Sequence, residues 1–178
     1  RLNMMFPTAD VEDSHTIPHR GDFILSIDGM TVMIETKNYS RNVQKAEIDK
    51  FYSDIDNPSN SDIGAAVFVS LHTGICNRED FQFEVRNGTP LIFIHNLVSN
   101  FDGIKLALSF FKMISDQGEI DFGHKETIDA FKNLASGIKR NFQKQKTTLD
   151  RYYTTQMELI TLQMSSISDL YGVVKQKF

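Results

Sequence analysis

The sequence predicts an α/β protein with a mixed central sheet flanked by helices, followed by a long helical segment. Between residues 10 and 95, apolar runs of strand length alternate with turn signals and with one helical pattern. Beyond residue 124 the chain contains no proline, and apolar residues recur at helical spacing. A chain of 178 residues can bury one core and carry an appendage. We therefore expect a core over residues 1–117 and a helical or coiled-coil extension over residues 124–178.

A two-residue hairpin is the most strongly predicted element. Asp28-Gly29 lies between two apolar runs, which is the strongest short-range hairpin signal. A turn at these residues fixes the register of the two strands. The expected pairs are Ile27 with Met30, Leu25 with Val32, Phe23 with Ile34 and Asp22 with Glu35. Apolar residues then lie on both faces, which predicts a sheet covered on both sides.

The other elements of the core follow from apolar periodicity and turn residues. We expect residues 1–20 to be irregular, with 10–13 as a short strand or an exposed turn. Ser40 is expected to cap a helix. The expected elements from there on are a helix over 42–56, a buried strand over 65–71, a second hairpin with strands over 81–85 and 91–94, a helix over 101–116 and a break over 118–123.

The C-terminal segment carries an apolar stripe with alternating spacings of three and four, the heptad rule. Three glutamines interrupt the stripe, and after Leu159 it slips by one residue onto Ile160. Such a slip marks a stutter or the end of regular pairing. We expect one long helix or a helical pair, used for self-association or for packing against the core. The basic residues of 139–146 fit a solvated helix face better than a DNA-clamping arm.

Two carboxylates and a lysine share one face at the open end of the first hairpin. Opposed residues have Cβ atoms roughly 4.5–5.5 Å apart, so Asp22 and Glu35 repel each other unless a cation intervenes. Lys37 lies two positions beyond Glu35 and projects from the same face. This arrangement is typical of a divalent-metal site. The alternative is a surface salt-bridge cluster worth about 0–1 kcal/mol, although two opposed acids do not help an ordinary strand pair.

Gly21-Asp22, the hairpin, Glu35-Thr36-Lys37 and the helix that follows resemble the PD-(D/E)xK nuclease superfamily, which has the restriction-endonuclease-like fold. The resemblance covers roughly residues 10–95. It implies that Asp22 and Glu35 bind the metal together with the backbone carbonyl of Thr36. It also implies that Lys37 orients or activates the attacking water and stabilises charge on the phosphate, either as a base or as a positioned cation. The implied cofactor is Mg²⁺ or Mn²⁺, in agreement with the oxygen ligands.

Further site residues are implied less directly by the resemblance. Many members carry an additional glutamate on a helix before the first strand, and that helix is expected upstream of Arg1. Glu12 is the candidate here, with Asp10 and Asp13 as alternatives. Gln44 falls where relatives have another polar active-site residue. The candidates for contact with nucleic acid are His19, Arg20, Arg41 and Lys45.

The predicted function is that of a Mg²⁺-dependent endo- or exodeoxyribonuclease that recognises DNA by its backbone or structure, because no base-reading motif is visible. The net charge of −4 argues against a generally basic nucleic-acid binder. It favours the alternative, a non-catalytic DNA-binding or assembly module that forms a homo-oligomer through its C-terminal helix. One cysteine, Cys76, and no apolar run of membrane-spanning length indicate an intracellular protein, in cytoplasm or nucleus and of viral or microbial origin, without membrane contact.

Overall fold

The computed structural model describes residues 2–99, 101–118 and 120–175, and the chain divides into two units, Arg1–Gly137 and Ile138–Phe178. The first unit is an α/β domain built on a six-stranded mixed sheet, as expected from the sequence. Its strands are β1 (Asp10–Asp13), β2 (Phe23–Ile27), β3 (Met30–Lys37), β4 (Ala65–Ser70), β5 (Gln82–Arg86) and β6 (Thr89–Ile94).

The strand order is β1-β2-β3-β4-β6-β5, with parallel pairing in the middle and antiparallel pairing at both edges. The predicted register of the first hairpin is confirmed, since Phe23 pairs with Ile34 and Ile27 with Met30. Its turn residues Asp28 and Gly29 both have positive φ, which a two-residue turn of this hand requires. The second hairpin, around Asn87-Gly88, is also confirmed.

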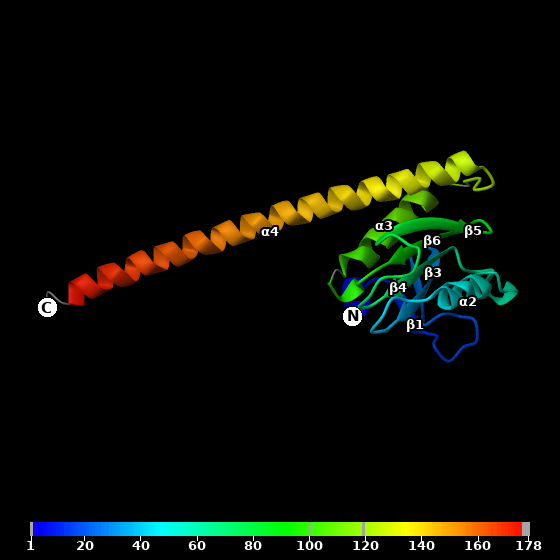
Figure 1. Cartoon of the computed structure of the whole chain (residues 1–178), viewed down its shortest axis with the longest axis horizontal. Helices are drawn as coiled ribbons and strands as arrows, with labels where there is room; N and C mark the ends of the chain where they lie inside the picture. Colours follow the sequence, from blue (N-terminus) through cyan, green and yellow to red (C-terminus); the bar gives the residue numbers. More distant parts are fainter. Residues whose placement is uncertain (1, 100, 119, 176–178) are drawn as a thin grey trace. The chain divides into compact units, whose positions relative to one another are not determined.

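Helix α2 (Lys45–Ile55) covers one face of the sheet and α3 (Asp102–Asp116) covers the other, as Figure 1 shows. Against α2 lies a core of alternate strand residues, among them Met33, Phe68 and Phe93. On the other face α3 approaches closely: a Cβ on Gly103 would lie 3.1 Å from Ile94. Every residue of β4 is buried, because helices cover both faces of this central parallel strand.

Three local expectations need correction. Ser40 does not cap α2: the helix begins at Lys45, and the residue at its N-cap is Gln44, whose side chain makes no capping hydrogen bond. Val43, expected inside the helix, instead forms a β-bridge with Ile75. The N-terminal segment is not irregular throughout, because it contains α1 (Leu2–Met5); of the two alternatives for residues 10–13, the short strand is present as β1.

The C-terminal segment forms α4 (Lys125–Lys175), one continuous helix that runs through Gly137. Its first turns belong to the α/β unit, where Phe131 makes ring contacts with Phe83 and Phe110. In the second unit, by contrast, large apolar side chains from Leu149 to Tyr171 are exposed. Among the described residues, no helix is long and apolar enough to cross a membrane.

Candidate functional site

Asp22 stands directly before β2 and is held against β3. Its backbone N–H donates to the carbonyl of Ile34, the last residue of β3 that pairs with β2. Its carboxylate Oδ2 accepts hydrogen bonds from the backbone N–H of Thr36 at 2.7 Å and from the Thr36 hydroxyl at 2.6 Å. The sequence predicts Asp22 opposite Glu35; the strand pairing instead ends one pair earlier, at Phe23 and Ile34, and the Asp22 carboxylate is held by Thr36.

Gly21 makes this approach possible. Its φ is +68°, and a Cβ at this position would lie 2.8 Å from Cγ of Met33. A side chain here would clash with the buried strand, and proline is excluded because its ring fixes φ near −65°. Glycine at position 21 therefore has a local structural cause.

Glu35 is a buried carboxylate, with only 5% of its surface exposed. Its Oε1 lies 2.7 Å from Nζ of Lys37. Burial raises the pKa of Glu35, the ammonium groups of Lys37 and Lys50 offset only part of that rise, and Asp22 adds to it. Two lysines therefore do not fully compensate for the burial of this carboxylate.

Lys37 lies between two carboxylates, because its Nζ is also 2.7 Å from Oε2 of Glu47 in the first turn of α2. Burial disfavours the ammonium, but the contacts with Glu35 and Glu47 outweigh that cost and raise the pKa of Lys37. The hydrogen bond from Lys37 lowers the pKa of Glu47. Tyr39 donates a hydrogen bond to the other oxygen of Glu47 at 2.9 Å. Lys37 is thus a fixed ammonium ion.

Glu47 is the site residue that sequence reasoning missed, and Gln44 was named in its place. Gln44 is exposed, and its amide donates to the carbonyl of Asn42. Glu47 is brought to Lys37 because it lies in the first turn of α2, beside the buried Ile48 and one turn before the buried Phe51, which pack against the sheet. The spacing of four between Glu47 and Phe51 was visible in the sequence and could have identified Glu47.

The backbone of Thr36 faces the same side as Asp22. In an extended strand the N–H and C=O of one residue point in the same direction. Because the Thr36 N–H donates to Asp22, the Thr36 carbonyl also points toward β2, whereas the carbonyl of the next residue, Lys37, accepts from Leu71 on the other side. Two carboxylates and one carbonyl oxygen are a donor set that suits Mg²⁺ or Mn²⁺ with several waters retained. Within the described ranges, no group of three or more His, Cys, Asp or Glu residues forms a ready metal cluster.

His19 and Arg20, predicted to contact nucleic acid, are bound to acids of the same unit. His19 Nδ1 lies 2.7 Å from the buried carboxylate of Asp54, and Arg20 makes a two-pronged contact with Asp62 at 2.6 and 2.7 Å. The side-chain amide of Asn60 donates to the carbonyl of His19 and accepts from Arg20. These contacts brace the loop that leads into Asp22.

The remaining predicted residues lie around this centre. Glu12 is exposed on β1, pairs with Ile24 and contributes to the raised pKa of Arg20, a smaller effect than that of Asp62. Arg41 and Lys45 are exposed between β3 and α2. The carbonyl of Arg41 accepts a hydrogen bond from the Thr73 hydroxyl, which ties this connection to the end of β4.

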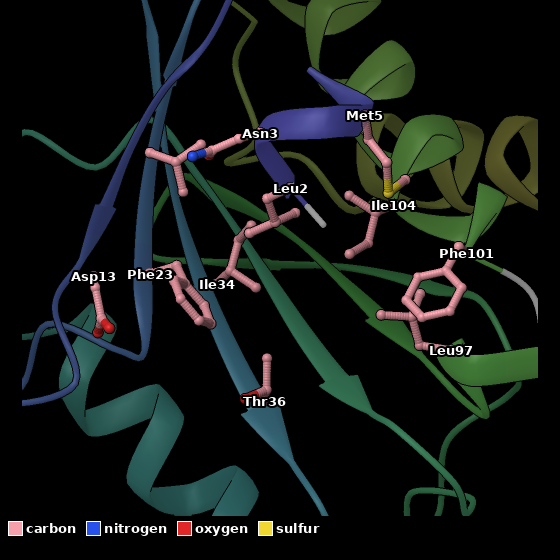
Figure 2. A pocket seen from close by; sticks show the side chains of 11 residues that line it. Leu2, Asn3, Met5, Asp13, Phe23, Ile34, Thr36, Leu97, Phe101 and Ile104 are labelled. Carbon is pink, nitrogen blue, oxygen red and sulfur yellow. The ribbon is translucent and has the colours of Figure 1, made fainter. Parts of the chain in front are cut away.

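A pocket of about 400 Å³ lies on the other side of β2 and β3, the side that α3 covers. Figure 2 shows Thr36 and Asp13 among its lining residues, with apolar side chains such as Leu2, Phe101 and Ile104 making up much of the rest. Among the residues that the structure describes, those lining this pocket include no basic side chain, and such a lining does not favour a phosphate. Polar chemistry on an anionic substrate therefore fits the face that carries Glu35 and Lys37.

Comparison of this chain with protein-family models, with curated proteins and with solved structures found no match.

Proposed function

We propose that this chain is a divalent-metal-dependent nuclease that hydrolyses phosphodiester bonds in DNA, with a restriction-endonuclease-like core. The observation that carries the proposal is the excess of carboxylate at the end of the first hairpin. Glu35, which is buried, and Glu47 both contact the ammonium of Lys37. Lys50 adds to the effect of Lys37 in lowering the pKa of both acids. Asp22 is a third acid that adds to the effect of burial in raising the pKa of Glu35, so three carboxylates face two ammonium groups. Buried carboxylates in excess of their cations are costly unless a metal ion or a proton joins them.

Each residue of the candidate site has a defined role in this proposal. Asp22 and Glu35 hold the ion, and the Thr36 carbonyl adds a neutral oxygen ligand. When bound, Mg²⁺ or Mn²⁺ lowers the pKa of a coordinated water and neutralises charge that develops on the phosphate. Glu47 is a positioning residue, because it keeps the Lys37 ammonium in place when Glu35 turns to a metal ion.

The raised pKa of Lys37 supports the role of a positioned cation. A lysine bound to two carboxylates keeps its proton at neutral pH. Lys37 therefore acts as a positioned cation toward a phosphate oxygen and does not serve as a general base. The exposed Arg41 and Lys45 extend positive charge away from the site and suit contacts with a phosphate backbone, which carry no sequence information.

Cleavage of supercoiled plasmid and of single- and double-stranded oligonucleotides with Mg²⁺ or Mn²⁺ tests the proposal. We expect Asp22→Asn and Glu35→Gln each to lower the cleavage rate at least about 100-fold. Glu84→Gln is the matched control, since Glu84 is a partly buried acid on the same α2-covered face whose charge Arg78 neutralises. Circular dichroism of each variant checks that it is folded.

Two outcomes would contradict this assignment. Cleavage that survives both Asp22→Asn and Glu35→Gln would move the chemistry elsewhere. No cleavage of any substrate, together with no binding of Mn²⁺ by electron paramagnetic resonance, would favour the second candidate, a non-catalytic module of nuclease fold. The net charge of −4 is the observation that favours that candidate.

A further inference from the structure

The exposed apolar residues of α4 follow an 11-residue repeat. Starting at Ile138, steps of four, three and four residues mark a stripe of ten positions. Eight of the ten positions are apolar and two are glutamines: Ile138, Phe142, Gln145, Leu149, Tyr153, Gln156, Ile160, Met164, Ile167 and Tyr171. The apparent slip after Leu159 belongs to this regular period, and α4 continues through it as one helix.

None of the ten stripe positions is occupied by a charged residue. All eight charged residues between positions 138 and 171 lie off these ten positions. From Leu149 onward the six apolar members of the stripe are all exposed, with Leu149, Tyr153 and Ile160 among them. A long uncharged stripe with exposed aromatic and branched side chains is typical of a helix that pairs with another.

The period restricts the partner. Eleven residues in three turns give about 3.67 residues per turn, which favours a right-handed supercoil, whereas heptads wind to the left. A heptad stripe drifts by roughly 20° per heptad around a straight helix, and an 11-residue stripe drifts in the opposite direction. The two kinds of stripe therefore move apart along the helix. A partner that stays in contact along the whole stripe must have the same 11-residue period, and a second copy of this chain has it by identity.

The two glutamines restrict the alignment. Gln145 and Gln156 are one repeat apart. In a parallel, in-register pair, each lies opposite its own copy, and an amide can both donate to and accept from an identical amide. A shift by one repeat would leave one glutamine of each helix against an apolar residue, so polar residues in the stripe fix the register at some cost in stability.

The exposed area is sufficient for a stable pair. A typical stable interface removes about 800 Å² from each partner. Tyr152, Tyr153 and Tyr171 are 59%, 61% and 68% exposed, and a buried aromatic side chain contributes about 150–250 Å². With the aliphatic members and Met157 beside the stripe, the segment reaches the required size.

We propose that residues 142–171 of α4 associate with the same residues of a second copy of this chain, parallel and in register, through the 11-residue stripe. This association does not depend on nuclease activity. It makes the protein a dimer that carries two α/β units.

Sedimentation of the full-length chain tests the association with a matched pair of variants. Ile160 lies on the stripe and Leu162 lies off it, and their exposed fractions are 47% and 64%. We expect Ile160→Glu to weaken association at least about 100-fold, because an unpaired carboxylate would be buried, and Leu162→Glu to leave it nearly unchanged. Glutamate is a good helix former, so neither change should unfold α4. A wild-type chain that remains monomeric at high micromolar concentration, or equal effects of the two variants, would overturn the proposal.

Disulfide cross-linking tests the alignment. In chains with Cys76→Ser, the variants Gln145→Cys and Gln156→Cys are each expected to form a disulfide with their own copy under mild oxidation. Glu158→Cys, which lies off the stripe, is the control and should not cross-link. Cross-linking only between a Gln145→Cys chain and a Gln156→Cys chain would overturn the parallel register.

Discussion

Two polar clusters lie on the same α2-covered face of the sheet, and they differ in charge balance. The first contains Glu35 and Glu47 in contact with the ammonium of Lys37, with Asp22 and Lys50 acting on Glu35 from nearby. The second lies toward β5 and pairs Glu84 with Arg78 and Asp56 with Arg86. Between them, the rings of Phe51, Phe68 and Phe93 pack in contact with one another.

The second cluster is neutral and well connected. Arg78 Nε lies 2.7 Å from Glu84 Oε1, an ion pair by distance without the direction of a good hydrogen bond. Tyr52 donates to the other oxygen of Glu84, and Gln82 donates to Oε1 at 2.6 Å. The guanidinium of Arg78 also lies 5.0 Å from the centroid of the Phe93 ring. Each acid in this cluster has an arginine beside it, so the cluster fastens β5 to α2.

The comparison separates a structural network from a candidate site by a physical criterion. Both clusters contain partly buried ions, and such ions alone do not indicate function. In the second cluster, positive and negative groups are equal in number. In the first, the three carboxylates of Asp22, Glu35 and Glu47 outnumber the two ammonium groups of Lys37 and Lys50, which leaves charge for a divalent ion to neutralise.

Removal of the central cation gives the largest expected difference. Lys37→Met leaves the buried Glu35 carboxylate beside Asp22 and without its ammonium, and we expect the free energy of unfolding to fall by about 3–5 kcal/mol. Arg78→Met should cost less, because Tyr52 and Gln82 still donate to Glu84. Urea denaturation without metal compares the two variants.

Divalent metal should stabilise the Lys37→Met and Arg78→Met variants to different extents. Mn²⁺ or Mg²⁺ should raise the thermal midpoint of Lys37→Met, since the ion replaces the missing positive charge, and should leave Arg78→Met no more stabilised than the wild type. Equal stabilisation of both variants would show that the excess of acid at the first cluster does not attract a divalent ion.

Tyr52 provides the next test, in the neutral cluster. Burial and the hydrogen bond to Glu84 raise the pKa of Tyr52 to about 12, from an ordinary value of 10.0. The neutral phenol therefore stabilises the folded state fully below the ordinary pKa, and this contribution is lost as the pH rises toward about 12. We expect Tyr52→Phe to cost about 1 kcal/mol at neutral pH and to remove the last step of the ultraviolet tyrosine titration. An unchanged titration curve would contradict the buried contact.

Much of the α/β core was predictable because its signals are local. Asp28-Gly29 fixed the register of the first hairpin as far as Phe23 and Ile34, and Asp22, the next residue, contacts Thr36. The expected strands and helices of the core are present, with small shifts in their ends. A turn of two residues is enough to determine the alignment of a whole strand pair.

The residues that sequence reasoning missed depend on contacts between distant segments. Glu47 reaches Lys37 only because α2 packs across β3, and His19 finds Asp54 across 35 residues. The Ser40 cap was wrong because the chain first forms the bridge from Val43 to Ile75, which delays the helix to Lys45. Tertiary pairing of this kind overrides a capping preference worth about 1 kcal/mol.

Asp56 gives the smallest expected effect and the clearest contrast in sign. The hydrogen bond from Arg86 lowers the pKa of Asp56, so its contribution to stability is present above the ordinary carboxyl value and is lost as the pH falls through the lowered pKa. Because the pair is partly exposed, we expect Asp56→Asn to cost less than about 1 kcal/mol at neutral pH and almost nothing in acid.

Glu35 should behave in the opposite way when metal is absent. Burial raises its pKa, so protonation favours the folded state, and this contribution is present below the ordinary value and lost as the pH rises through the raised pKa. Glu35→Gln mimics the protonated acid and should gain stability relative to the wild type as the pH rises from acid to neutral. Urea denaturation at both pH values measures the two slopes. Slopes of the same sign for Asp56→Asn and Glu35→Gln would remove the distinction between a neutral cluster and one with excess acid.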